Sequence, residues 1–130
     1  MSLITVDLRD RKQLYEQLID NIKALILSGE FKKDDKLPSV RSLAKELGIN
    51  PNTIQKAYSE LERCGIIMTL PGRGSIVLAD RVNLRDEMTV RLETAMTALA
   101  HEMEQSGITK EEFVRAAENA WDRTGGIQND

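Results

Sequence analysis

The sequence has little of what disulfide-bonded, metal-binding or membrane proteins require. Its 130 residues include one cysteine, Cys64, and one histidine, His101. A single thiol cannot form an internal disulfide, and a lone histidine without a second histidine or clustered carboxylates is poor metal-ligand material. No segment is apolar over the roughly 20 residues that a membrane span requires. We therefore expect no bound metal, no cofactor and no membrane partner.

Catalytic motifs are lacking as well. There is no nucleophile paired with a base and no phosphate-binding glycine loop, since Gly72-Arg73-Gly74 is too short for one. The first seven residues show no basic region followed by an apolar stretch, as secretory signals do. We expect a cytoplasmic protein that is not an enzyme, with one domain and an appendage, because a typical domain takes about 100–150 residues.

What the sequence does have is an uneven distribution of charge. The net charge is −3, which by itself argues mildly against a nucleic-acid ligand. Residues 1–78, however, carry 12 Lys and Arg against 10 Asp and Glu, whereas residues 79–130 carry 6 against 11. This asymmetry is typical of a chain in which one part faces phosphates and the other part has a different task.

Three helices are predicted in the N-terminal part. Apolar residues recur every three or four positions over residues 13–28, which indicates one buried helix face. A second helix is expected over residues 40–47, with Ser39 as its N-cap. A third helix should begin at Pro51 with Asn50 as its cap, because proline at the first helical position loses no needed hydrogen bond.

The second and third predicted helices form a recognisable motif. Residues 43–58 are predicted to form a helix, a short turn that contains glycine and a second helix, which is the layout of a helix-turn-helix. The polar stretch 32–36 is expected to be a loop. Two strand-like runs, residues 66–69 and 75–78, predict a hairpin, which is called a wing beside such a motif. The predicted fold is mostly α with a small β-hairpin: an N-terminal winged helix-turn-helix followed by an α-helical hairpin.

The remainder of the chain is predicted to be a helical tail. Apolar residues at near-heptad spacing indicate a helix of about five turns, and Thr109 with Glu112 forms a capping box that opens a last helix. We expect the winged domain over residues 1–79, the tail over 80–124 and a frayed end over 125–130.

The tail predicts a homodimer. Two helices of this size enclose too little interior to bury both of their apolar faces. A second copy of the chain is therefore expected to pack against these faces. His101 is expected to be an ordinary surface or core residue, and Trp121 an interface anchor. The residues expected at the dimer interface are Leu84, Met88, Leu92, Ala95, Leu99, Met103, Phe113 and Trp121.

Four sequence blocks in order resemble the GntR family of bacterial regulators: LPSVRSLA (37–44), GINPNTIQKAY (48–58), Leu61-Glu62 and GRGS (72–75). The resemblance extends over residues 14–78. The Asn-Pro-Asn-Thr turn and the short two-helix tail are similar to the YtrA-like subfamily, whose members usually repress small operons, often ones for transporters. The resemblance implies a DNA-binding repressor with a winged helix-turn-helix, and it places Arg41 at a position where the family contacts DNA.

Candidate DNA contacts follow from the motif and the resemblance together. Asn52 and Gln55 are expected to favour A·T pairs, because an amide can bridge the N6 and N7 of adenine. Many family members carry arginine where this chain has Pro51 and Gln55, so guanine contacts made by those arginines cannot be carried over. Arg73 is placed to enter a narrow minor groove. The full set of expected contacts to double-stranded DNA is Ser39, Arg41, Asn50, Pro51, Asn52, Thr53, Gln55, Lys56, Gly72, Arg73 and Gly74.

Several alternatives stay open at this point. Asn50 could serve only as a helix cap, and Gly72 and Gly74 could be needed only by the turn. A small-molecule effector, if there is one, is expected between subunits or near residues 80–85. The competing interpretation of the whole chain is a winged helix used for protein interaction or RNA binding, without operator specificity.

Overall fold

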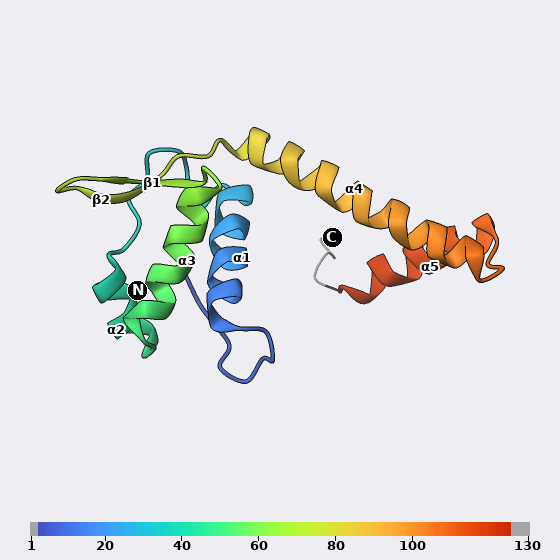
Figure 1. The fold of residues 1–130 in the computed structure, drawn as a ribbon, viewed down its shortest axis with the longest axis horizontal. Helices are drawn as coiled ribbons and strands as arrows, with labels where there is room; N and C mark the ends of the chain where they lie inside the picture. Colours follow the sequence, from blue (N-terminus) through green and yellow to red (C-terminus); the bar gives the residue numbers. More distant parts are fainter. Residues whose placement is uncertain (1–2, 126–130) are drawn as a thin grey trace. The chain divides into compact units, whose positions relative to one another are not determined.

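The computed structural model describes residues 3–125, which form two compact units, one ending at Glu87 and one starting at Met88 (Figure 1). The prediction of a frayed end falls, apart from Gly125, outside the described residues. The elements in chain order are α1 (Leu14–Leu27), α2 (Val40–Leu47), α3 (Pro51–Arg63), β1 (Ile67–Leu70), β2 (Gly74–Val77), α4 (Arg81–Gln105) and α5 (Lys110–Arg123).

The core of the first unit lies between α1 and α3, which run side by side (Figure 1). As the sequence predicted, apolar residues at three- and four-residue spacing face inward on each helix. Ile4, which no periodic pattern marks, is also buried and brings the N-terminal segment onto this core. The buried helix residues that meet here are Leu18, Ile22 and Ile26 of α1 and Ile54, Ala57, Tyr58 and Leu61 of α3.

The helix-turn-helix forms where the sequence predicted it, and its caps explain its boundaries. The Ser39 hydroxyl accepts a hydrogen bond from the Ser42 N–H at 3.0 Å, which starts α2. Gly48 ends α2 with a φ of 69°, a left-handed conformation that is costly for other residues. The Asn50 side chain accepts from the Asn52 N–H at 2.8 Å, and Pro51 occupies the first turn of α3.

The hairpin is one residue offset from the predicted runs, because its connection is short. Leu70 pairs with Gly74, and the three-residue loop between them has Pro71 followed by Gly72 at φ 74°. The Arg73 N–H donates to the Leu70 carbonyl at 2.9 Å. Proline then a left-handed glycine is the arrangement of a type II turn, so Gly72 has a conformational role whatever else it does.

The prediction of a plain loop over residues 32–36 was wrong at its end. Lys36 forms a bridge with Ile76, and the Asp34 N–H and the Leu37 N–H donate to the carbonyls of Val77 and Ser75, both at 2.8 Å. The segment therefore lies along the outer edge of β2. An unpaired edge leaves backbone donors and acceptors without partners, and this pairing satisfies them and fixes the hairpin to the first unit.

The second unit consists of the rest of α4 and the whole of α5. The predicted capping box is present: the Thr109 hydroxyl accepts from the Glu112 N–H, and the Glu112 carboxylate accepts from the Thr109 N–H at 2.9 Å. The hydrogen bonds that the Glu112 carboxylate accepts, from the Thr109 N–H foremost and then from the Thr109 hydroxyl, lower its pKa. No described side chain beyond Leu84 is buried, so the two helices have apolar residues but no core of their own.

Tyr58 connects the helices of the motif, and its replacement gives a first prediction. Its side chain is 4% exposed, and its hydroxyl donates to the Pro38 carbonyl, just before α2, at 2.7 Å. Burial raises the pKa of the Tyr58 phenol above its ordinary 10.0. The neutral phenol is thus favoured in the folded state, so its contribution to stability is complete below the ordinary pKa and is lost as pH rises through the raised value.

We expect Tyr58→Phe to lower the free energy of unfolding by about 1 kcal/mol at neutral pH, since one neutral hydrogen bond to the Pro38 carbonyl is lost. Above pH 10 the wild-type protein should lose stability more steeply than the variant. Urea denaturation at pH 7 and at increasing alkaline pH measures both effects. If the free energy of unfolding fell equally with alkaline pH in both proteins, the assignment of the pH dependence to the Tyr58 phenol would be contradicted.

Candidate nucleic-acid interface

The first turns of α3 present a polar surface opposite the core. Asn52, Gln55 and Lys56 are exposed, while Ile54 lies on the inner face of the same helix and is fully buried. The alternation follows the 3.6-residue repeat, because residues that pack against α1 recur on one side only. The remaining residues predicted for this surface are also accessible: Asn50 and Pro51 are exposed, and Thr53 is half-buried.

These side chains differ in how many hydrogen-bond donors and acceptors they have left for a ligand. Within residues 3–125 the Asn52 amide has no hydrogen-bond partner, so its donor and acceptor are both free. Asn50 uses its carbonyl oxygen as a helix cap and keeps its NH₂ group. Gln55 donates from Nε2 to the Ser59 hydroxyl at 3.1 Å and keeps its carbonyl oxygen. Asn52 is therefore the amide best able to form a bidentate pair with a base.

Lys56 has a neighbour that the sequence analysis did not anticipate. Its ammonium nitrogen lies 3.9 Å from the centre of the Tyr15 ring, which α1 supplies. A cation over an aromatic face gains about 0.5–1 kcal/mol at an exposed site. This contact orients Lys56 across α3 toward α1.

Arg41 and Ser39 lie at the N-terminal end of α2. Arg41 is exposed, and no salt bridge involves it among the described residues. Ser39 accepts the capping hydrogen bond, while its O–H can still donate outward. A planar guanidinium with five free donors beside a helix N-terminus suits phosphate or a guanine edge.

The tip of the hairpin carries Arg73 between two glycines with positive φ, Gly72 at 74° and Gly74 at 83°. Arg73 is exposed, and the aliphatic part of Lys36 lies against Gly74, whose missing Cβ would stand 3.6 Å from the Lys36 Cε. The edge pairing of residues 34–37 thus brings a second cation to the wing. In Figure 1, α2 and the hairpin both extend to the left of α3. Within this unit α2 lies beside the start of α3, while the hairpin lies at the level of its other end.

The apolar side chains that were predicted for a dimer interface are exposed or half-buried, with one exception. Leu92 and Leu99 are 52% and 51% exposed, and Trp121 is 64% exposed. Leu84 is only 3% exposed and belongs to the first unit, so its prediction as an interface residue was wrong: it is already covered within its own chain. Of the other predicted residues, Ala95 is exposed, and Met88, Met103 and Phe113 are half-buried.

Two further apolar residues of this surface were missed. Met96 is 50% exposed on α4, and Val114 is 45% exposed on α5. Met96 stands four residues after Leu92 and three before Leu99, so the helical repeat itself could have identified it. We call Leu92, Met96, Leu99, Val114 and Trp121 the tail surface.

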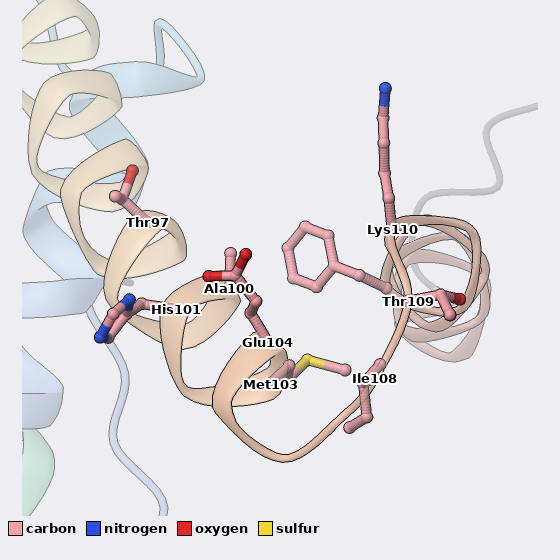
Figure 2. Close-up of a pocket in the computed structure, with 9 residues that line it drawn as sticks. Thr97, Ala100, His101, Met103, Glu104, Ile108, Thr109 and Lys110 are labelled. Atoms are coloured by element: carbon pink, nitrogen blue, oxygen red, sulfur yellow. The ribbon is translucent and has the colours of Figure 1, made fainter.

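A hollow of about 390 Å³ lies between α4 and α5 (Figure 2). In the close-up the side chain of Met103 lies near that of Ile108, while His101 comes from the α4 turn before it. The hollow is lined by Thr97, Ala100, His101, Met103, Glu104, Ile108, Thr109, Lys110 and Phe113. The described residues hold no cluster of three metal-ligating side chains, there or elsewhere. No helix in the described part is long and apolar enough to cross a membrane.

The geometry defines a class of protein. A helix-turn-helix with an exposed polar α3, an arginine at the start of α2 and a hairpin tipped by a second arginine is a winged helix-turn-helix domain of the DNA-binding kind. The chain belongs to the gntR family of bacterial regulatory proteins, whose pattern matches residues 14–77.

Individual relatives agree with this assignment. The chain is 44% identical over 103 residues to the HTH-type transcriptional repressor YtrA of Bacillus subtilis, covering 79% of this chain and 75% of that one. It is 38% identical to the transcriptional regulator YhcF of the same organism, covering 79% and 85% of the two chains. A solved transcriptional regulator from Oenococcus oeni superposes with a TM-score of 0.70 at 30% identity, over 89% of this chain and 97% of that one.

These findings confirm three predictions made from the sequence: the family with its YtrA-like character, the fold class, and the expectation of a transcriptional regulator rather than an enzyme. The individual DNA contacts and the dimer interface remain predictions, which the geometry described above makes specific.

Proposed function

We propose that the protein is a homodimeric repressor in the bacterial cytoplasm that binds a palindromic operator. Each subunit presents the first turns of its α3 to the major groove. The observation that carries the proposal is the exposed, polar start of α3, together with exposed arginines on α2 and on the hairpin of the same unit, Arg41 and Arg73. The relative named as a repressor, YtrA of B. subtilis, supports repression as the outcome of binding.

Base reading is assigned to Asn52 and Gln55. Their amides offer the donor and acceptor pair that adenine presents in the major groove. Asn52 is free of other hydrogen bonds within the described residues, and Gln55 keeps its carbonyl oxygen and one Nε2 hydrogen beside its bond to Ser59. Ser39, Arg41, Asn50, Pro51, Thr53 and Lys56 are assigned to the backbone of the DNA, where contacts fix register without reading sequence.

The wing gives a second contact and a testable prediction. Arg73 is exposed at the tip of the hairpin between two glycines with positive φ, and narrow A·T minor grooves attract arginine. We expect Arg73→Ala to weaken operator binding by about tenfold and to lower the salt slope of log K by about one unit per subunit. Fluorescence anisotropy at several salt concentrations measures both. Arg115→Ala, an exposed arginine of α5, is the matched control and should change neither.

Dimerisation is assigned to the tail surface. Two half-sites one helical turn apart, about 34 Å, require two copies of α3 held in a fixed relation. In the second unit every described apolar side chain is exposed or half-buried, and a protein does not usually leave so many of them in water. A second copy of the same tail offers the complementary apolar surface, as two-fold interfaces do.

Selection of binding sites from random double-stranded DNA tests the proposal directly. The enriched sequences should form an inverted repeat with A·T pairs opposite Asn52 and Gln55, and sedimentation should give a dimer. Occurrence of that repeat upstream of the regulated genes would show whether they include a transporter operon, as the resemblance suggests. Selection that enriches no common sequence, or enriches only single-stranded RNA in a parallel pool, would favour the alternative of an interaction or RNA-binding module.

A further inference from the structure

A second cavity, of about 310 Å³, lies wholly within the first unit and is not part of the DNA-contact surface. It is formed where the end of α1, the loop after it and the start of α4 meet. Its lining combines an apolar floor with charged side chains at the rim: Ile26, Gly29, Phe31, Lys32, Lys33, Ala79, Asp80 and Arg81. A volume near 300 Å³ is at the small end of the range for ligand sites.

The floor of the cavity is apolar and firmly held. Ile26 is 1% exposed and belongs to the core of the first unit, while Phe31 is half-buried above it. The Phe31 N–H donates to the Leu25 carbonyl at 3.0 Å, which fixes the loop onto the end of α1. A pre-formed apolar floor favours a ligand with a non-polar body, because binding removes that body from water without rearranging the protein.

The rim has an excess of positive charge. Among the residues that line the cavity, Lys32, Lys33 and Arg81 outnumber the one carboxylate, Asp80, which gives the lining a formal excess of two positive charges. One oxygen of Asp80 is occupied, because it accepts from the Val82 N–H at 2.8 Å. Within residues 3–125 none of the three cations forms a salt bridge. The rim therefore holds cationic donors that have no anion of their own.

Gly29 lies beside one of these donors. It has a φ of 86°, and a Cβ built there would stand 3.9 Å from the Arg81 Nη1. The guanidinium thus lies over the bare backbone at the end of α1, beside the cavity. Its planar set of N–H groups matches two oxygens of a phosphate or carboxylate at once.

We propose that this cavity binds a small phosphate monoester with an apolar body. The phosphate group, with a charge of about −1.5 to −2 at pH 7, matches the excess of two positive charges. Its oxygens accept from Arg81, Lys32 and Lys33, and its body lies on Ile26 and Phe31. The use of this site by an effector rests on the proposed function, whereas binding itself does not.

The position of the cavity is suited to regulation. Arg81 is the first residue of α4, the helix that continues into the second unit. Lys33 directly precedes Asp34, whose N–H pairs with Val77 of the wing. A ligand held by both residues would therefore join the start of the tail to the segment that supports the hairpin, and could change operator affinity through either.

Titration of the full-length, ¹⁵N-labelled protein with phenyl phosphate tests the proposal without DNA, so its failure is distinguishable from failure of operator binding. We expect amide shifts centred on Gly29, Phe31 and Arg81 and a Kd below about 1 mM. Benzyl alcohol, which lacks the anion, and inorganic phosphate, which lacks the body, should each bind at least about tenfold more weakly.

Two variants with the same change of charge complete the test. Arg81→Gln should weaken phenyl phosphate binding by about tenfold or more, since charge-assisted hydrogen bonds are lost. Arg115→Gln, on α5 and away from the cavity, should leave the Kd unchanged. Equal Kd values for the two variants, shifts that avoid Gly29 and Arg81, or binding of benzyl alcohol as strong as that of phenyl phosphate would each overturn the proposal.

Discussion

Leu99→Glu is expected to convert the dimer into a monomer and to lower operator affinity by at least about 100-fold. Leu99 is the last α4 residue of the tail surface, three residues after Met96, and is half exposed in the single chain. A carboxylate there would have to be buried against the apolar residues of a second copy, which costs several kcal/mol for an unpaired charge. Binding of two half-sites would then no longer be linked, and linkage of two sites contributes about 10²–10⁴ in affinity.

Ala98→Glu is the matched control for this prediction. It adds the same charge at the neighbouring position of α4, which is exposed and faces away from the tail surface by the helical repeat. Sedimentation velocity should give a dimer for Ala98→Glu and a monomer for Leu99→Glu, with equal helix content by circular dichroism. A Leu99→Glu protein that stays dimeric and binds DNA normally would contradict the assignment of the tail surface.

Asn52→Ala should have the second largest effect, a loss of about 1–3 kcal/mol of discrimination at one base pair in each half-site. The free amide of Asn52 is the group that we assign to adenine, and alanine removes both its donor and its acceptor. Because the side chain is uncharged, binding to scrambled DNA and the salt slope should not change. Competition binding with operators altered at single positions measures the effect base by base.

Asn83→Ala is the corresponding control, since Asn83 is an exposed asparagine at the start of α4. It should retain full discrimination at every position. Two outcomes would show that Asn52 does not read a base. Either Asn52→Ala keeps full discrimination between base pairs at every position, or it lowers the affinity for operator and for scrambled DNA equally.

The helices and their ends could be predicted from the sequence because each rests on local chemistry. Ser39, Asn50 and Thr109 cap their helices as expected, and Gly48 ends α2 in a left-handed conformation. Caps and periodicity involve residues at most a few positions apart, so the chain itself encodes them.

The structural features that could not be predicted from the sequence depend on contacts between distant segments. The pairing of residues 34–37 with β2 and the Lys56 ammonium over the Tyr15 ring each join parts separated by more than a helix turn. Leu84 is the clearest example of a wrong prediction. Its position fits the near-heptad spacing of the tail, yet its side chain is buried within its own chain. Periodicity identifies which face is apolar and not which neighbour covers that face.

The central claim is that the start of α3 reads bases while a second copy does the same one helical turn away. The most direct measurement is a binding titration of the full-length protein with its selected inverted repeat and with a scrambled duplex of the same composition, at two salt concentrations. The account predicts that the repeat binds at least about 10³ times more tightly than the scrambled duplex and that both affinities fall with salt. Equal affinity for the two duplexes at both salt concentrations would contradict it.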